Sequence, residues 1–244
     1  MERETYDRMR VLEQTHWWFT ARRRILAGEI ARLPLPPTAR ILEVGCGPGG
    51  NLEMLARFGD LQAIEPDAES RAWAAERSGV PVHGGLLPDG LPDLGGPLDL
   101  IAAFDVIEHV GDDQGAVNAL AGLLKPGGQM ITTVPAHAWL WSQHDVAHHH
   151  RRRYAMADYR RLFTAAGLRV RRASYFNSIL FPPIAAVRLA GRLLGRQGGD
   201  DEALPPPALN AVLRALFASE AALLKAVDLP FGVSILLTAE KPPA

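Results

Sequence analysis

The sequence predicts an α/β fold: a doubly wound, seven-stranded and mostly parallel sheet, with an N-terminal helical cap and an insertion before the last strand. Three observations carry this prediction. Short β-branched runs alternate with segments whose apolar residues recur at helical spacing, the connections between them are brief, and a glycine-rich turn follows the first run. This alternation favours parallel strands, because each crossover helix returns the chain to the same edge of the sheet.

The elements are predicted in chain order. Two segments with helical apolar spacing, residues 6–13 and 19–32, are expected in the N-terminal cap, residues 1–36, and LPLPP ends the second one. The remaining residues, 37–244, are expected to form the sheet domain. Its strands are predicted at 39–45, 61–66, 80–85, 97–110 (running into a loop), 129–136, 169–176 and 232–240, and its helices at 51–58, 68–78, 113–124 and 157–166. LKPGG, residues 124–128, is predicted to be a turn.

One stretch, residues 179–230, breaks the alternation. It contains an apolar segment with Arg188 and Arg192 four residues apart, a linker at 196–207 and a predicted helix at 208–227. We expect an insertion between the sixth and seventh strands. The arginine-bearing segment suits an amphipathic helix, which predicts a lid over the sheet or, as the alternative, a segment that lies at a membrane surface.

Composition limits the class of protein. The formal net charge is −1 and 48% of the residues are hydrophobic, as in ordinary globular domains. Nucleic-acid-binding proteins are usually more basic, so no nucleic-acid partner is expected. The single cysteine, Cys46, excludes a disulfide within the chain, which is compatible with a cytoplasmic protein. No uninterrupted apolar run reaches the roughly 20 residues of a membrane span, so any membrane contact is predicted to be peripheral.

The glycine-rich turn has the spacing of a nucleotide-binding loop. Gly45, Gly47 and Gly50 fit GxGxxG, and Glu65, about twenty residues on, can accept hydrogen bonds from two ribose hydroxyls. This pattern alone suits both a nicotinamide dinucleotide and S-adenosyl-L-methionine (SAM). Glu43 discriminates between them, because a carboxylate at the end of the first strand repels a pyrophosphate and attracts the ammonium group of SAM.

The combined motifs resemble class I SAM-dependent methyltransferases, most of all the branch with ubiquinone-pathway and small-molecule enzymes. The likeness covers about residues 40–240, and it rests on Glu43-x-Gly45-x-Gly47-x-Gly49, Glu65, FDVIEHV at 104–110 and LLKPGG at 123–128. It implies a Rossmann-like fold, SAM as cofactor, S-adenosyl-L-homocysteine as product, and a small or lipid-linked acceptor.

The resemblance also implies a cofactor site. Glu43 is expected at the amino end of the methionine part and Glu65 at the ribose, while the N-terminal helices close over the cofactor. Many relatives bind the adenine amine with an acid where this chain has Gly85 and Leu86, which predicts recognition through backbone amides. For the aromatic cluster at 16–19, a hydrophobic staple at the helix start is the alternative. The implied cofactor-binding residues are Glu43, Gly45, Cys46, Gly47, Gly49, Glu65, Pro66, Gly85, Leu86, Phe104, Asp105, Trp18 and Arg23.

Half of the histidines stand in WLWSQHDVAHHHRRRY, residues 139–154, after the fifth strand. Substrates bind at that edge of open α/β sheets, so we expect this loop to hold the acceptor, with arginines for an anionic group. A solvated polar loop is the alternative. The predicted substrate-binding residues are His16, Trp141, Arg152 and Tyr154.

Methyl transfer to a hydroxyl needs nucleophile, methyl carbon and sulfur in line, and a base that removes the hydroxyl proton. The candidates for this base are His109, His144 and His149. HDVAH is a poor HExxH zinc motif, because Asp145 is shorter than a glutamate base and the motif offers no third ligand. No metal ligand is assigned, although an ion that assists an O-methyltransferase stays open. O-methylation is the prediction; C- or N-methylation and a non-catalytic SAM-binding protein are the alternatives, and the oligomeric state is left open.

Overall fold

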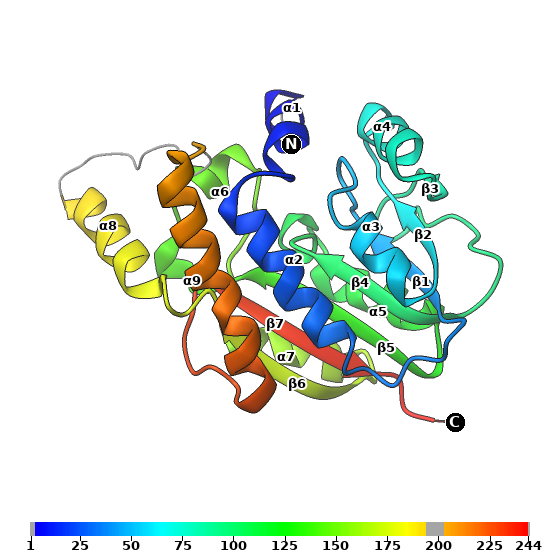
Figure 1. The fold of residues 1–244 in the computed structure, drawn as a ribbon. Coiled ribbons are helices and arrows are strands. Elements are labelled where there is room, and N and C mark those ends of the chain that lie inside the picture. The colour runs from blue at the N-terminus through cyan, green and yellow to red at the C-terminus, as the bar shows by residue number, and fades with distance from the viewer. Residues whose placement is uncertain (1–2, 194–202, 244) are drawn as a thin grey trace.

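The computed structural model describes residues 3–193 and 203–243. Its centre is a seven-stranded sheet in the order β3-β2-β1-β4-β5-β7-β6 (Figure 1). β7 runs antiparallel to both of its neighbours and the other neighbouring pairs are parallel, which confirms the predicted fold class. The strands are β1 (Arg40–Val44), β2 (Asp60–Ile64), β3 (Val82–His83), β4 (Leu98–Phe104), β5 (Leu124–Pro135), β6 (Arg169–Phe176) and β7 (Ser234–Glu240).

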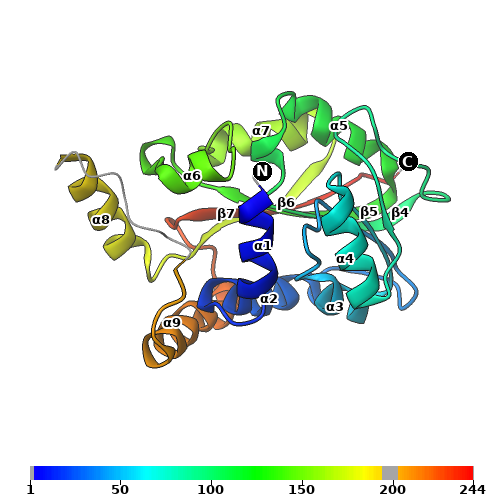
Figure 2. The ribbon, with the colours of Figure 1, turned by 90° about the horizontal axis from the view of Figure 1, so that it is seen from above.

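Helices cover both faces of the sheet. Seen from above, α2, α3 and α9 lie on one face and α5 and α7 on the other (Figure 2). Because side chains alternate between the faces of each strand, each face has its own apolar core. The helices are α1 (Arg3–Leu12), α2 (Trp17–Ile30), α3 (Leu52–Leu55), α4 (Ala68–Ser78), α5 (Asp113–Leu123), α6 (Gln143–Ala147), α7 (Met156–Ala165), α8 (Phe181–Leu193) and α9 (Pro207–Ala226).

The turn that was predicted at residues 124–128 is not observed. These residues are part of β5: Leu124 already pairs with Leu98 of β4, and the register then shifts across the two glycines. Gly127 stays attached to the sheet because its backbone N–H donates to the Lys241 carbonyl (2.8 Å). Two other elements are shorter than predicted: the third strand is Val82–His83, and the helix predicted at 51–58 passes into a 3₁₀ turn, Ala56–Phe58.

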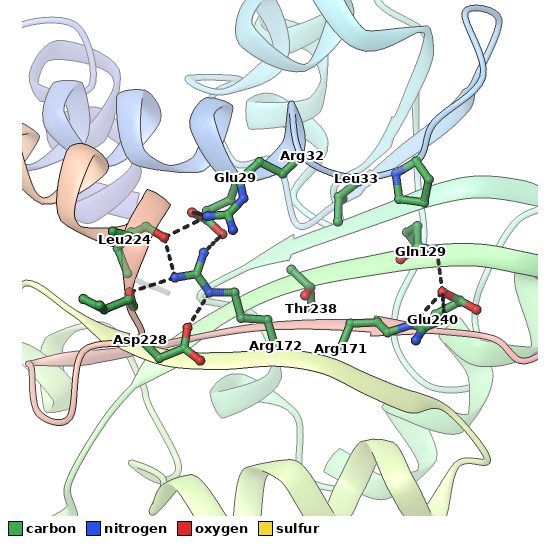
Figure 3. A pocket seen from close by; sticks show the side chains of 13 residues that line it. Glu29, Arg32, Leu33, Gln129, Arg171, Arg172, Leu224, Asp228, Thr238 and Glu240 are labelled. Atoms are coloured by element: carbon green, nitrogen blue, oxygen red, sulfur yellow. Dashed lines mark hydrogen bonds and ion pairs between the residues drawn. The ribbon is translucent and has the colours of Figure 1, made fainter.

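The second half of the predicted insertion is built into a helix layer. α9 packs along α2, and Phe217 of α9 is fully buried with its ring stacked on Phe176 of β6 (centroids 6.1 Å apart). Arg172 of β6 holds the end of α9. Its guanidinium donates to the Glu29 carboxylate of α2 (2.6 Å) and to the Leu224 carbonyl of α9 (2.6 Å), so the charged groups in this hollow bind one another (Figure 3).

α8 lies apart from that layer (Figure 1). Most of the predicted linker, residues 196–202, lies outside the described residues. Within the part of the chain that the structure describes, α9 is the one helix long and apolar enough to cross a membrane. About 22% of this apolar window of α9 is buried, and α9 packs against α2.

Candidate cofactor and acceptor site

The strands β1, β2 and β4 end at one cavity of about 630 Å³. The loops after these strands form one wall, residues of α2 and the segment before it form a second, and the loop that contains α6 closes the far end. Parallel strands that end at the same edge bring their loops together there, which is why ligands bind at this place in open α/β sheets. The volume suits a small-molecule site, for which roughly 300–1,000 Å³ is usual.

The loop after β1 needs its glycines. Gly45 and Gly47 have positive φ angles of 67° and 54°, which residues with a side chain disfavour. A Cβ at Gly45 would also lie 2.8 Å from Cγ2 of Val106. Both glycines line the cavity with Cys46 between them, and burial raises the pKa of the Cys46 thiol, so it is a packed residue rather than a nucleophile. Gly49 packs against α3 and α4, outside the cavity lining.

Glu65, directly after β2, ties the glycine loop to the second strand. Its Oε2 accepts a hydrogen bond from the Gly47 backbone N–H (2.8 Å), and its Oε1 accepts one from the Asp67 backbone N–H (2.9 Å). The residue is buried and borders the cavity. Glu65 therefore lies where a ribose-binding carboxylate was predicted, and it also braces the loop.

Two buried carboxyl groups lie near the glycine loop. Glu13, which follows α1, lines the cavity, and its Oε2 has no hydrogen-bond partner among the described residues. Burial raises the pKa of Glu13 to about 7, against the opposing charge of Arg23. Glu43 lies behind the lining, where its Oε1 accepts a hydrogen bond from Nδ2 of Asn51 (2.8 Å), and burial raises its pKa to about 8. A cationic ligand would favour the ionised form of both groups.

Arg22 occupies the place that was predicted for Arg23. Its guanidinium forms an ion pair with Asp105, donates to Oγ1 of Thr133 (3.0 Å) and lies over the rings of Trp18 (4.8 Å) and Phe104. Arg23 points away, donates to the Glu13 carbonyl (2.6 Å) and is outside the cavity lining. The helical spacing of Trp18 and Arg22, four residues apart, was the signal that favours Arg22.

Asp105 adopts an unusual backbone conformation. Its φ is 57°, a region that residues with a side chain seldom occupy, directly after β4. The ion pair with Arg22 and a hydrogen bond from Thr133 (3.2 Å) hold it there. Such conformations gather at functional sites, where the surroundings hold them in place.

The cavity brings together most of the predicted cofactor residues. Those that line it are Trp18, Gly45, Cys46, Gly47, Glu65, Pro66, Gly85, Leu86, Phe104 and Asp105. Glu43, Gly49 and Arg23 do not line it. Sequence reasoning missed Glu13 altogether, because nothing in its neighbourhood along the chain resembles a motif.

Four histidines meet at the far end of the cavity, where we expect the acceptor: His109, His144, His148 and His150. The rings of His109 and His150 are edge to face, with centroids 4.8 Å apart. Burial, with smaller contributions from His150 and His148, lowers the pKa of His109 to about 3. His149, the third predicted base, is exposed and lies outside the lining. His16 lines the cavity and caps α2, accepting from the Trp18 N–H (3.3 Å).

Asp145 stabilises the conformation of the loop that contains α6. It is fully buried and accepts hydrogen bonds from the Ser142 N–H (2.8 Å) and from Nε of Arg153 (2.7 Å), and it bonds Nδ1 of His150 (2.8 Å). Burial by itself raises the pKa of Asp145, but these partners outweigh it and hold the pKa well below its usual range. Asp145 is therefore a permanently charged structural anchor, which agrees with rejecting a protease-like role for HDVAH.

Three predicted acceptor residues lie outside the cavity lining: Trp141, Arg152 and Tyr154. Arg152 and the Tyr154 hydroxyl both bind Asp113 of α5 (2.5 and 2.8 Å), so they attach the loop to α5. Besides Arg22, the arginines that line the cavity are Arg151, Arg153 and Arg188. Arg151 and Arg153 turn toward the cavity and Arg152 turns away. The sequence does not show this alternation, because it depends on the path of the backbone.

Sequence comparisons find methyltransferase relatives of this chain. Residues 18–173 match the sequence model of a methyltransferase domain. A ubiquinone biosynthesis O-methyltransferase of Xylella fastidiosa is 39% identical over 109 residues, 42% of this chain and 44% of that protein. A trans-aconitate 2-methyltransferase of Variovorax paradoxus is 34% identical over 110 residues, 43% of this chain and 42% of that protein. The chain thus matches less than half the length of these curated relatives.

Solved structures extend the likeness to the whole fold. The Haloferax volcanii partner of the methyltransferase activator Trm112 is 18% identical, with a TM-score of 0.64 over 99% of this chain and 96% of that chain. Phosphoethanolamine N-methyltransferase 2 of Haemonchus contortus, solved with S-adenosyl-L-methionine, is 17% identical, with a TM-score of 0.57 over 89% of this chain and 52% of that one. The [4+2]-cyclase SpnF is 21% identical, with a TM-score of 0.57 over 91% of this chain and 81% of that chain. At these identities the likeness concerns the fold alone, and the reaction has to be argued from the site.

Proposed function

Because the chain belongs to the class I SAM-dependent methyltransferases, we propose that it transfers a methyl group from SAM to a hydroxyl group of a small or lipid-linked acceptor. The methyltransferase-domain match confirms the predicted family and the cofactor that defines it. The observation that best supports the proposal is the convergence of the glycine loop, Glu65 and Glu13 on one cavity.

The residues present fit the cofactor part by part. Glu13 Oε2 is buried without a hydrogen-bond partner among the described residues, and the amino group of a methionine would satisfy it. Glu65 is placed to accept from ribose hydroxyls, and Pro66, Gly85 and Leu86 line the part of the cavity left for adenine. When bound there, SAM supplies an electrophilic methyl group.

The chain's own residues then position the acceptor and take its proton. Arg22 and Asp105 form an ion pair beside the proposed position of the sulfonium. We propose that this pair holds one side of the cavity in place, against which the acceptor is oriented. Orientation is the main contribution that an enzyme makes to a displacement of this kind. His109 and His144 line the acceptor end and are the two proposed proton acceptors, whereas His149 lies outside the lining.

The acceptor is proposed to carry an anionic group. Arg151, Arg153 and Arg188 line the far end of the cavity, and Asp145 compensates the charge of Arg153. The guanidinium groups of Arg151 and Arg188 supply donors of the kind that bind a carboxylate or phosphate. One relative acts, by its name, on trans-aconitate, a small anion, and another is an O-methyltransferase, which supports an oxygen-rich acceptor.

α8 is proposed to act as a lid that also contacts lipid. Its Arg188 and Arg192 donate to the carbonyls of Leu140 (2.5 Å) and Trp141 (3.0 Å) and so hold the helix over the acceptor loop. Val187 and Leu189 point outward and are 69% and 46% exposed. We retain the prediction of a cytoplasmic protein with peripheral membrane contact; liposome co-sedimentation no better than that of a Val187→Ser/Leu189→Ser variant would remove the lipid part.

Methyl transfer is tested with the purified full chain and SAM labelled in its methyl group. Small-molecule and lipid extracts serve as acceptor sources, and the labelled product is analysed for ether, ester, amine or carbon linkage. The Glu65→Ala variant is expected to lose transfer, and His83→Gln, which changes a histidine outside the cavity, is expected to keep it. Binding of SAM without transfer to any extract would support the non-catalytic alternative instead.

A further inference from the structure

We propose that Glu108, His109 and His150 form a binding site for one divalent transition-metal ion at the acceptor end of the cavity. Binding of the ion does not depend on methyl transfer, whereas its use in the reaction rests on the function proposed above. All three residues line the cavity, and their potential ligand atoms lie within 4.8 Å of one another.

Glu108 is the first reason for this assignment. It is fully buried in the 3₁₀ turn Ile107–His109 after β4, and neither carboxyl oxygen has a hydrogen-bond partner among the described residues. Buried polar atoms are nearly always paired, so two unpaired oxygens on one side chain that faces a cavity call for a ligand. A cation is the ligand that a carboxylate in a dry site binds most strongly.

The two histidines are held as metal-binding histidines usually are. Nδ1 of His150 is bonded to the buried Asp145 carboxylate (2.8 Å), which leaves Nε2 for a ligand. His109 is hydrogen-bonded to the backbone of His149, so one of its ring nitrogens is oriented in the same way. A carboxylate or carbonyl behind each imidazole fixes the tautomer and the ring orientation, and it raises the basicity of the ligating nitrogen.

Two of the guanidinium groups near the site are paired with carboxylates, whereas Arg151, whose Nε donates to the His109 carbonyl (3.0 Å), borders the site as a further positive charge. The two guanidinium groups that act on Glu108 are those of Arg22 and Arg153. Arg22 is paired with Asp105, and Arg153 is paired with Asp145 at 2.7 Å. The carboxylate of Glu108 is therefore left to interact with a ligand in the cavity.

Two imidazoles and one carboxylate specify the class of metal. This donor set suits Zn²⁺, Fe²⁺, Co²⁺ or Mn²⁺ and not Ca²⁺ or Mg²⁺, which prefer oxygen ligands. Ligand bonds of about 2.1 Å place neighbouring ligand atoms about 3–3.5 Å apart. Ligand atoms up to 4.8 Å apart would therefore have to approach one another by up to about 1.3–1.8 Å. Three protein ligands leave coordination positions open toward the cavity, as in catalytic sites.

The ion would activate the acceptor. A hydroxyl bound to a divalent ion would lose its proton near neutral pH, which would supply the oxygen nucleophile for O-methylation. Because His109 would be a metal ligand, His144 would receive this proton. The acceptor oxygen would then form a bond to the methyl carbon while the carbon–sulfur bond breaks, and the electron pair of that bond would move to sulfur. Charge balances because the sulfonium charge is lost as His144 becomes protonated.

The first test is metal binding to the protein alone. The full chain, freed of any affinity tag and stripped with a chelator, is titrated with Co²⁺ and with Zn²⁺ in the absence of SAM and acceptor. We expect one ion per chain and a weakening of more than about tenfold in Glu108→Gln and in His150→Gln. His83→Gln, which alters a histidine bonded to Gln62 at the other edge of the sheet, should leave binding unchanged.

A second measurement needs no variant. X-ray absorption of the cobalt- or zinc-loaded wild-type chain should show two imidazole ligands together with oxygen. Absence of binding by the wild type, binding unaffected by both substitutions, or a shell of oxygen alone would overturn the site. Loss of binding in His144→Gln with retention in His150→Gln would overturn it as well, because the ion would then belong to His144 of α6 and to His148, which follows that helix.

Measuring methyl transfer with and without the metal ion distinguishes a failure of the metal site from a failure of the proposed function. Methyl transfer that persists at full rate in the stripped protein would overturn the role of the ion in the reaction. A protein that binds the ion as expected but transfers no methyl group would support the site and contradict the proposed function.

Discussion

Glu13→Gln tests how the cavity recognises a cation. The pKa of Glu13 is raised by burial from 4.5 to about 7 in the folded chain. The folded state therefore holds a proton to higher pH than the unfolded state, and the stability that this group contributes is lost as pH rises from 4.5 to 7. A pKa difference of about 2.5, at about 1.4 kcal/mol for each pH unit, gives an upper limit of about 3.5 kcal/mol.

Glutamine has the shape of the glutamate side chain but does not ionise. At pH 8 the variant should be more stable than the wild type by up to about 3.5 kcal/mol, and near pH 4.5 the two should be equally stable. Its affinity for SAM should fall by about tenfold or more, because a charged hydrogen bond worth about 1.5–3 kcal/mol is lost. Binding of a cation to the wild type at pH 6 should also release a proton from Glu13, and the variant should lack this release.

Denaturant unfolding between pH 4.5 and 9 measures the stability difference. Calorimetry in two buffers with different ionisation enthalpies measures affinity and proton release together. Glu53→Gln is the matched control, because that side chain is 87% exposed on α3. If Glu13→Gln were no more stable than wild type at pH 8, or bound SAM with unchanged affinity and proton release, Glu13 would not be the carboxyl group that meets the amino group.

Four further substitutions test other parts of the site and the fold. Glu65→Ala should lower SAM affinity at least about tenfold, because it removes the acceptor for ribose and for the Gly47 N–H; calorimetry with unchanged affinity would contradict the ribose assignment. Arg22→Gln should lower methyl transfer, whereas Arg23→Gln should leave it close to wild type, and equal rates in both variants would show that the side chain facing the cavity does not matter. Phe217→Ala should destabilise the chain by about 3–5 kcal/mol in a thermal or denaturant melt, because a fully buried ring is removed where α9 meets β6; a loss below about 1 kcal/mol would mean that α9 is not an integral part of the fold.

The sheet and the cofactor motif were predictable because both depend on residues close together in the chain. β6 and α4 have the predicted bounds, 169–176 and 68–78. Gly45 and Gly47 follow a buried strand, and their positive φ angles need glycine wherever that turn occurs. Glu65 reaches Gly47 because parallel β1 and β2 end at the same edge, a consequence of the strand order alone.

The acceptor end was not predictable in the same way, because it is assembled from segments far apart in the chain. HHHRRR contains no signal that His150 and Arg153 turn toward Asp145 while His149 and Arg152 turn away. The same holds for Glu13 and Arg22, whose positions depend on how α1 and α2 pack over the sheet.

By itself, then, the sequence determined the order of strands and helices, the glycine turn and the acidic residues that favour SAM over a dinucleotide, since these follow from periodicity and local backbone geometry. Only the tertiary structure decided which arginine and which histidines reach the cavity, and that Glu108 is buried with two unpaired oxygens beside two imidazoles. The physical reason is that burial and pairing depend on neighbours brought together by the fold, and the local sequence does not specify those neighbours.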